Sequence, residues 1–511
     1  MKHSLAKLYA AELDGIDARL IEVETDVQGG LHSFTIVGLA DKALSESKER
    51  INAALKNSGF KPPNQENRKI IVNLAPADVK KAGSQYDLSI ALGYLSASGQ
   101  MKQFAGEKYI FLGELALDGA LRSVSGVMNT ARLAAERGIP YLVVPTTNAV
   151  EAAMINGVTV LPVATLTQII AHLEGRKKIS SQPQTVPTRR IKTGPSILDI
   201  KGQEHAKRAL LIAAAGGHNL LMVGPPGTGK TMLAQAALSL LPDPDISEIV
   251  EITQIYSAAG LLGEEPYIAH RPFRTPHQTS SPVSIIGGGQ HPRPGEISLA
   301  HRGVLFLDEL PEFRRDLLEA LRQPLESGHS VVTRVQGTVR FPARFMLIAA
   351  MNPCPCGYYG DDERNCKCGQ YEVERYQKKV SGPLLDRIDL QISVPRVAIA
   401  DLRAKTQTDN GELDALREKV SLARSRQQQR FKSQHVRLNS EMSSKEVDEH
   451  INLDARAEQF MRGIATKQLL SPRGVYRVLK TAQTIADLDN RDSVTQNDLA
   501  EAFAYRLREQ Q

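Results

Sequence analysis

The sequence predicts a multidomain α/β protein in which two α/β domains precede an all-helical C-terminal domain. Strand-like apolar runs alternate with helical patterns over residues 1–172, and this alternation resumes near Ile197. From about Val394 only helical periodicity is strong. A chain of 511 residues also exceeds the about 250–300 residues that one hydrophobic core usually serves. The expected regions are 1–172, a linker at 173–196, 197–393 and 394–511.

The composition is that of an ordinary globular protein, with 41% apolar and 23% charged residues. We expect a cytoplasmic protein, because no window offers about 20 apolar residues for a transmembrane helix and the N-terminus lacks a signal-peptide core. The net charge of +6 equals the number of Lys and Arg residues in one stretch, RKKISSQPQTVPTRRIK, at 176–192. This linker is interpreted either as a solvated hinge or as a segment that contacts a polyanion transiently.

Short apolar runs and amphipathic stretches define the elements of each region. In the first region the strand-like runs are FTIVGL, KIIVNLA and YLVVP, and the helix-like stretches are ALSESKERINAALKNSG and VMNTARLAAERG. In the second region the runs are NLLMVG, GVLFLDE and RFMLIAAMN, and each ends at chemically reactive residues. In the last region TQND predicts a helix capped by Thr495, with Asp498 three residues further on.

One stretch predicts a phosphate-binding loop. GPPGTGKT fits G-x-x-x-x-G-K-[ST] and lies between the strand-like LLMV and the helix-like TMLAQAALSLL. Its glycines would let backbone N–H groups curl around phosphate oxygens at a helix N-terminus. Lys230 is expected to reach the β- and γ-phosphates of ATP, and Thr231 to hold Mg²⁺. The expected ATP-binding residues are Gly224, Pro225, Pro226, Gly227, Thr228, Gly229, Lys230 and Thr231.

Two further strand ends supply polar groups suited to ATP hydrolysis. GVLFLDEL places Asp308 and Glu309 after an apolar run. Asp308 is expected to support Mg²⁺ and Glu309 to polarise the attacking water. A lone run of this kind also fits a strand that leads into a helix cap, but its pairing with the phosphate-binding loop favours catalysis. Asn352, after RFMLIAAMN, could orient the water or bind the γ-phosphate, although taken alone it would be a turn residue.

This set of strand ends resembles the AAA+ ATPases. SGPLLDRIDL is similar to the arginine-finger segment of the branch that includes magnesium chelatase and the MCM helicases. The resemblance implies that Arg387 enters the ATP site of a neighbouring subunit. LLSPRGVYRVLKTAQTIADL is similar to the sensor-2 helix, which implies that Arg473 approaches the γ-phosphate in its own subunit or the next. Arg477 is the rival sensor one turn away, and a surface ion pair is the alternative for either arginine.

Two longer stretches of sequence resemble one particular family within this branch. RPFRTPHQTSSPVSIIGGGQHPRPGEISLAHRGVLFLDELPEF and MNPCPCGYYG are similar to the magnesium chelatase-like bacterial competence proteins of the ComM/YifB family. The resemblance extends through all three regions of the chain. It implies a homo-hexameric AAA+ ATPase that uses ATP and Mg²⁺ and acts on single-stranded or branched DNA. The implied activity is branch migration, which assists the integration of DNA in recombination and natural transformation, with recombination proteins as further partners.

The first region resembles the S5-like α/β proteolytic domain of Lon and its relative in RadA, through FLGELALDGALRSVSGVMNTARLAAERGIPYLVVPTTN. A Lon-type protease needs a Ser nucleophile and a Lys base. Gln85 falls at the Ser position, with Ser84 adjacent, and Met128 falls at the Lys position. We therefore expect a non-proteolytic module that has a structural or DNA-contacting role.

Three functions are compatible with these sequence patterns. The first is a hexameric motor that translocates on DNA, the second a chelatase-type ATPase subunit that helps insert Mg²⁺ into a porphyrin, and the third an ATP-dependent protease or unfoldase. The missing Ser and Lys argue against proteolysis. Chelatase subunits, by family resemblance, lack a Lon-like front domain and a paired CxC cluster. The motor is therefore favoured.

All four cysteines of the chain lie in the stretch MNPCPCGYYGDDERNCKC, as Cys354, Cys356, Cys366 and Cys368. Four thiolates suit tetrahedral Zn²⁺, and exclusive clustering favours a structural zinc loop. The alternatives are a loop with incidental thiols and a redox sensor.

A DNA-gripping hairpin is expected between Glu326 and Asn352, because VVTRV and TVRF alternate like strands around Gln336-Gly337. In the AAA+ branch resembled here such a hairpin enters the pore of the ring, so Arg334 and Arg340 are expected to hold DNA phosphates. The segments with Arg271, Arg274 and Arg293 are expected to form a second pore loop. The alternative is a set of charges on a solvated hairpin.

Overall fold

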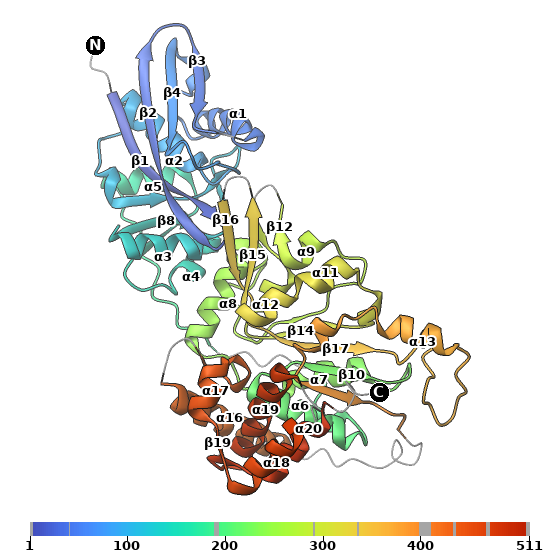
Figure 1. Ribbon diagram of the computed structural model, residues 1–511. Coiled ribbons are helices and arrows are strands. Elements are labelled where there is room, and N and C mark those ends of the chain that lie inside the picture. The colour runs from blue at the N-terminus through green and yellow to red at the C-terminus, as the bar shows by residue number, and fades with distance from the viewer. Residues whose placement is uncertain are drawn as a thin grey trace.

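The computed structural model describes residues 4–39, 41–188, 194–289, 292–334, 337–397, 410–432, 436–466 and 471–506. Figure 1 shows an N-terminal domain at one end, a central domain built on a second sheet, and a helical region at the other end. The expected order of two α/β regions and a helical region is confirmed. Among the described residues, no helix is both long and apolar enough to cross a membrane.

The N-terminal domain is built on a seven-stranded mixed sheet. The strand order is β3 (Ser33–Val37), β4 (Arg68–Ala75), β2 (Asp17–Gly29), β1 (Ser4–Asp14), β5 (Tyr109–Phe111), β8 (Tyr141–Pro145) and β9 (Thr159–Val163). Helix α2 (Asp87–Ser98) packs on β1 and β2 and is buried along nearly its whole length, which explains its apolar sequence. The other elements are α1 (Lys42–Asn57), β6 (Glu114–Leu115), β7 (Leu121–Arg122), α3 (Val127–Arg137), α4 (Ala149–Ala152) and α5 (Leu166–Leu173).

The central domain contains a five-stranded sheet in which every adjacent pair of strands is parallel. The order is β11 (Phe273–Arg274), β14 (Val304–Leu307), β17 (Met346–Met351), β10 (Leu220–Val223) and β18 (Leu390–Ser393). β10, β14 and β17 are buried throughout, because helices cover both faces of such a sheet. The helices are α6 (Glu204–Gly216), α7 (Lys230–Leu240), α8 (Ile246–Ala259), α9 (Pro282–Ile286), α10 (Glu296–Leu299), α11 (Arg315–Ala320), α12 (Arg322–Ser327), α13 (Gln370–Gln377) and α14 (Gly382–Leu385).

Two hairpins of the central domain lie beneath the N-terminal domain (Figure 1). The expected hairpin is present, since β15 (His329–Arg334) pairs antiparallel with β16 (Gly337–Pro342); Gln336 lies outside the described residues. Beside it lies the short pair β12 (Gly287–Gly288) and β13 (Arg293–Pro294). A Cβ added to Gly15, in the β1–β2 turn, would lie 2.3 Å from Cγ1 of Val339. The hairpin therefore touches the N-terminal domain.

The helical region packs on the central domain through a shared apolar core, in which α6 contacts α16 and α19. Its helices are α16 (Asn410–Phe431), α17 (Ser444–His450), α18 (Ala455–Thr466), α19 (Pro472–Leu488) and α20 (Gln496–Ala504). α20 starts as expected, with Thr495 as the N-cap and Asp498 completing the capping box. The short parallel pair of β19 (Asn452–Leu453) and β20 (Ser493–Val494) was not predicted by the helical periodicity.

Helix α8 joins the central domain to the N-terminal domain. The backbone N–H of Gly126, at the start of α3, donates to the carbonyl of Ser257 at 2.9 Å. Met128 and Met154 of the N-terminal domain pack against Ile249 of α8 in one buried apolar cluster. The N-terminal domain is thus seated directly on this helix.

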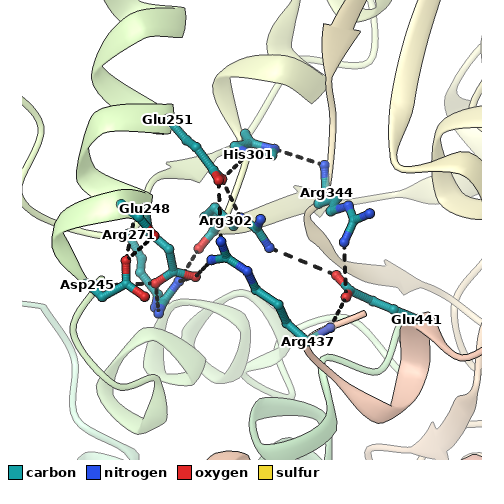
Figure 2. Close-up of polar contacts among 10 residues, drawn as sticks. Asp245, Glu248, Glu251, Arg271, His301, Arg302, Arg344, Arg437 and Glu441 are labelled. Atoms are coloured by element: carbon teal, nitrogen blue, oxygen red, sulfur yellow. Dashed lines mark hydrogen bonds and ion pairs between the residues drawn. The ribbon is translucent and has the colours of Figure 1, made fainter. Parts of the chain in front are cut away.

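The same helix is tied to the helical region by an ion-pair network, which Figure 2 shows. Arg437 lies 3.5 Å from Glu251 and 3.9 Å from Glu248, both on α8. Glu441 accepts from the backbone N–H of Arg437 at 2.8 Å and from Arg344, of the central domain, at 3.1 Å. These contacts connect the three regions through side chains around one helix.

Glu251 is held by three cationic or polar groups. It accepts from Nε2 of His301 at 3.1 Å and from Nε of Arg302 at 2.8 Å, in addition to its pair with Arg437. Nδ1 of His301 accepts from the backbone N–H of Arg344, so Nε2 carries the proton that is donated to Glu251. Burial alone would raise the pKa of Glu251, but the bonds from His301 and Arg302 lower it to about 2.

This network predicts a pH-dependent loss of stability when Glu251 is neutralised. Because the folded-state pKa lies below the unfolded value of about 4.3, the stabilising effect is present above that value and disappears as the pH falls toward 2. Glu251→Gln should lower the free energy of unfolding at pH 7 by about 1–3 kcal/mol, and by less at pH ~3. Urea denaturation at both pH values measures this.

Glu136→Gln is the matched control, since Glu136 pairs with Arg132 on the exposed face of α3. Such a surface pair contributes only about 0.3–0.5 kcal/mol. Equal effects of the two substitutions at pH 7 would show that the network does not stabilise the contact between the regions.

Candidate nucleotide-binding site

The carboxyl ends of β10, β14 and β17 bring the expected nucleotide-binding residues to one edge of the sheet. Gly224 follows β10, Asp308 follows β14, and Asn352 follows β17. The register pairs Val223 with Met351, so the phosphate-binding loop and Asn352 leave adjacent strands at the same level. Open α/β sheets bind ligands at this edge.

The glycines of residues 224–231 occupy positions where a side chain would clash or would strain the backbone. A Cβ added to Gly224 would lie 2.2 Å from the carbonyl oxygen of Val394, so only glycine fits there. Gly227 and Gly229 have φ values of 80° and 82°, in the left-handed region that favours glycine. Gly229 is also the N-cap residue of α7, which therefore presents its free N–H groups and positive dipole end to the loop.

Lys230 points into the phosphate-binding loop. Its Nζ donates to the carbonyls of Gly224 at 2.7 Å and Pro225 at 2.8 Å, and to Oδ1 of Asn352 at 3.3 Å. Burial lowers the pKa of Lys230, although the charges of Asp308 and Glu309 oppose this shift. An ammonium group placed between the loop and Asn352 could bind a phosphate oxygen at that position.

The two residues expected to hold Mg²⁺ lie together. Oγ1 of Thr231 donates to Oδ2 of Asp308 at 2.9 Å. A hydroxyl and a carboxylate at this spacing are the oxygen ligands that Mg²⁺ uses beside phosphates. Glu309, the next residue, is exposed and has a φ of 52°. A non-glycine residue in that conformation is strained, and such strain is concentrated at functional sites.

The structure adds residues that the sequence analysis did not identify. Arg375, Tyr376 and Lys379 line a cavity of about 430 Å³ together with Glu309 and Asn352. All three follow the cysteine-rich stretch, in α13 or just after it. Burial, with added repulsion from nearby carboxylates, raises the pKa of Tyr376 to about 12. Arg375 is exposed and could reach a phosphate, whereas the ammonium of Lys379 already pairs with a carboxylate, that of Glu312, at 3.1 Å.

Arg387 and Arg473 come together at a cavity that residues 224–231 do not line. Glu326 accepts from Arg387 and lies 3.7 Å from Arg473. Arg387 also donates to the carbonyls of Arg322 at 3.1 Å and Pro383 at 2.7 Å. With Arg477 and Lys480 they line a cavity of about 670 Å³ between the central domain and the helical region.

Arg473 and Arg477, the two sensor candidates, differ in availability. Arg473 is 61% exposed, whereas Arg477 is 21% exposed and is bound to Asp389 and to the carbonyl of Arg387. Arg477 therefore has a structural partner already. The geometry favours Arg473 as the arginine that can reach a ligand.

The four cysteines meet in space. The Sγ atom of Cys354 lies 3.4 Å from that of Cys356 and 3.7 Å from that of Cys366, and the Cys356–Cys366 distance is 3.6 Å. All four Sγ atoms, including that of Cys368, lie within 4.8 Å of one another. A tetrahedral zinc site has Zn–S bonds near 2.3 Å and hence S···S edges near ~3.8 Å.

Backbone N–H groups face this cluster as well. The N–H of Tyr359 donates to Sγ of Cys354 at 3.3 Å, and that of Cys368 donates to Sγ of Cys366 at 3.4 Å. Hydrogen bonds from the backbone of Lys367 and Tyr358 lower the pKa of Cys356. The four sulfur atoms together form a donor set that suits a soft, tetrahedral cation.

The arginines expected to contact DNA differ in their surroundings. Arg340 on β16 and Arg293 on β13 are exposed; the side chain of Arg334 lies outside the described part of the chain. Arg271 is 9% exposed and pairs with Glu248 at 2.8 Å, while Arg274 pairs with Glu296 at 2.6 Å. Carboxylates thus hold both guanidinium groups within the fold, and the contact of Arg271 and Arg274 with DNA stays a prediction.

The N-terminal domain does not assemble a Ser–Lys pair at the positions compared with Lon. Nε2 of Gln85 donates to Glu12 at 3.0 Å, and the hydroxyl of Ser84 donates to Glu114. Met128 is fully buried in the apolar contact with α8. A cationic amine at position 128 would thus be placed in an apolar interface. Lys81, which was not predicted from the sequence, is a buried lysine three residues from Ser84, and its Nζ donates to the carbonyl of Pro76.

Comparisons with known proteins agree with this arrangement. The family described as Magnesium chelatase, subunit ChlI, matches residues 196–402. Subunit ChlI of Mg-chelatase matches residues 23–148, and Magnesium chelatase, subunit ChlI C-terminal, matches residues 410–506.

The similar proteins include two that align with nearly the whole chain. Competence protein ComM of Haemophilus influenzae is 41% identical over 98% of this chain and 97% of its own length. The protein YifB of Escherichia coli is also 41% identical, with the same shares covered. Magnesium-chelatase subunit ChlI of Mesostigma viride is 23% identical over 60% of this chain and 85% of its own length. With the parallel sheet and phosphate-binding loop, these matches show that the chain belongs to the magnesium chelatase-like AAA+ ATPases of the ComM/YifB family.

Proposed function

We propose that this protein is a hexameric AAA+ ATPase that translocates on DNA and promotes branch migration during recombination, including the integration of DNA in natural transformation. The observation that carries the ATPase part of the proposal is the convergence of Lys230, Thr231, Asp308 and Asn352 at one edge of the sheet. The 41% identity to a competence protein supports its DNA-directed role.

In this proposal the phosphate-binding loop holds ATP, and Thr231 with Asp308 holds Mg²⁺. Glu309 acts as the base that polarises the attacking water, and Asn352 orients that water or the γ-phosphate. The hydrogen bond from Lys230 to Asn352 supports this division of roles, because it brings the strand end of β17 within reach of the same phosphate.

Arg387 and Arg473 act on the nucleotide of the neighbouring subunit. Both side chains share Glu326, so a ligand that approaches one of them also approaches the other. Their position in a cavity between two regions, apart from Lys230, supports action in trans. Binding of a γ-phosphate would compete with Glu326 for both guanidinium groups.

The β15–β16 hairpin grips DNA in the pore of the ring. Arg340 is exposed on one strand and Arg293 is exposed on the neighbouring β13. Both groups could bind backbone phosphates, which contribute affinity without reading the base sequence. The contact of Val339 with Gly15 places this hairpin at the boundary with the N-terminal domain.

The cysteine cluster binds one structural Zn²⁺ per chain. The supporting observation is the set of S···S separations among Cys354, Cys356 and Cys366, which are 3.4–3.7 Å and therefore close to a tetrahedral edge.

A chelatase-type ATPase subunit is the second candidate function, since the three matching family descriptions name a chelatase subunit. The ChlI protein of Mesostigma viride nevertheless leaves two fifths of this chain unmatched, whereas ComM matches 98% of it. ATPase assays with single-stranded DNA, porphyrin or casein separate the candidates. Stimulation by DNA alone is expected.

Substitutions in the ATP site should separate binding from hydrolysis. Lys230→Ala should abolish ATP binding, because the phosphates lose their main cationic partner. Glu309→Gln should retain ATP binding but lose hydrolysis, since an amide cannot act as a base. Binding of a fluorescent ATP analogue and phosphate release measure the two steps. Normal turnover by Glu309→Gln would overturn the assignment of the base.

Mixing experiments test the trans action of Arg387. Arg387→Ala should reduce hydrolysis by a factor of ~10³–10⁵, the range for arginine fingers in related enzymes. Mixed rings of Arg387→Ala and Lys230→Ala subunits should regain part of the ATPase activity, because some interfaces pair an intact finger with an intact site. Proven mixed rings that remain inactive would contradict action in trans.

The hairpin is tested through the salt dependence of DNA binding. Arg334→Ala with Arg340→Ala should lower the slope of log K against log salt by ~0.7–0.9 for each phosphate that the protein no longer binds. ATPase activity without DNA should stay near normal. Arg462→Ala, on the exposed face of α18, is the control that should leave the slope unchanged. An unchanged slope in the double variant would exclude the hairpin as the grip.

A further inference from the structure

The cysteine loop, residues 354–368, begins and ends at the nucleotide site. Cys354 is fully buried and lies two residues after Asn352, whose Oδ1 accepts from Lys230. Cys368 lies two residues before α13, the helix that brings Arg375 to the cavity shared with Glu309 and Asn352. The loop thus connects two walls of that cavity.

The first half of the loop rests on the phosphate-binding loop. Gly357 is buried, with a φ of 87°, and its N–H donates to the carbonyl of Cys354 at 3.0 Å. A Cβ added to Gly357 would lie 2.7 Å from Cδ of Pro226 and 3.9 Å from Cγ of Asn352. The backbone of the cysteine loop is therefore in direct contact with a residue of the ATP-binding stretch.

The second half of the loop is fixed at other points. Asp361 accepts from Nε of Arg396 at 2.9 Å, just beyond β18. The side chain of Gln377, at the end of α13, donates to the carbonyl of Pro353 at 3.0 Å. Between Cys356 and Cys366 the nine intervening residues are mostly polar and offer little apolar surface to bury. Arg364 donates to the hydroxyl of Tyr358 at 2.9 Å, and the four sulfur atoms are the further groups that can join the two halves.

We propose that a metal ion bound by the four thiolates turns the cysteine loop into a brace for the nucleotide site, so that ATP binding and hydrolysis depend on a metal that does not contact the nucleotide. The metal links the Cys354–Cys356 pair, which adjoins Pro226 and Asn352, to the Cys366–Cys368 pair, which adjoins α13. This proposal rests on the proposed zinc site and the proposed ATPase activity. It adds that the ATPase activity depends on the bound zinc.

If the metal braces the loop, movement of either half of the loop should disturb the nucleotide site. Loss of the metal frees Gly357 to move away from Pro226 and frees the start of α13 to move relative to Asn352. Misplacement of reacting groups by ~1 Å can cost about 100-fold in rate. We therefore expect metal removal to lower the rate of hydrolysis at least tenfold and to weaken ATP binding.

The experiment uses the full-length protein in excess Mg²⁺. Elemental analysis should find one zinc per chain, and a chelator selective for Zn²⁺ over Mg²⁺ should remove it with loss of ATPase activity that added Zn²⁺ restores. Cys366→Ser with Cys368→Ser should abolish both zinc content and activity. Circular dichroism and gel filtration report whether each sample remains folded and assembled.

Two further variants keep all four cysteines. Gly357→Val should retain zinc but weaken ATP binding, because its side chain would collide with Pro226. Asp362→Asn, an exposed change in the same loop, should preserve zinc, ATP binding and hydrolysis. Gly357→Val tests whether the contact with Pro226 matters for ATP binding while zinc is retained, and Asp362→Asn controls for a general disturbance of the loop.

The possible failures are distinguishable. A zinc-free wild-type protein with full ATPase activity would overturn both the zinc assignment and the brace. Zinc in the wild type, with unchanged ATP binding and hydrolysis after its removal from folded protein, would overturn the brace alone. A wild-type protein that holds zinc but has no ATPase activity would overturn the proposed function. In that case the affinity for the fluorescent ATP analogue, compared before and after zinc removal, would still decide whether the brace supports the binding site.

Discussion

Parallel hydrogen bonding of β10 to both β17 and β18 is the constraint on which the nucleotide site depends. Because β14 also pairs parallel with β17, the carboxyl ends of β10, β14 and β17 bring the phosphate-binding loop, Asp308 and Asn352 to a single edge. The close approach of Gly224 to the carbonyl of Val394 follows from the same pairing. A side chain at position 224 would force the loop away from β18 and disturb every contact that Lys230 makes.

Much of this site could be predicted from the sequence, because its information is local. A glycine-rich loop between an apolar strand and a helix, and acidic or amide residues at strand ends, specify both structure and chemistry within about ten residues. The capped start of α20 at Thr495 was predictable for the same reason, since the cap and its partner Asp498 are three residues apart. The spatial meeting of the four cysteines also followed from their short separation.

Other features depend on partners that are distant in the sequence. Arg271 and Arg274 belong to a basic segment, and nothing local indicates that Glu248 and Glu296, more than twenty residues away, already hold them. Arg375 is near Glu309 only because the cysteine loop folds back on the sheet. The burial of Met128 against α8 depends on the docking of two domains. Local patterns therefore identify candidate groups, whereas tertiary packing decides which remain available.

The double attachment of α8 restricts how the molecule can move. One end of the protein holds this helix through Arg437, and the other rests on it through Met128 and the backbone of Gly126. If the helical region rotates against the sheet, the salt links to Glu248 and Glu251 must break, or α8 must turn with it. In the second case the N-terminal domain moves together with α8, and the position of this domain relative to Val339 changes. The two ends of the chain are therefore not mechanically independent.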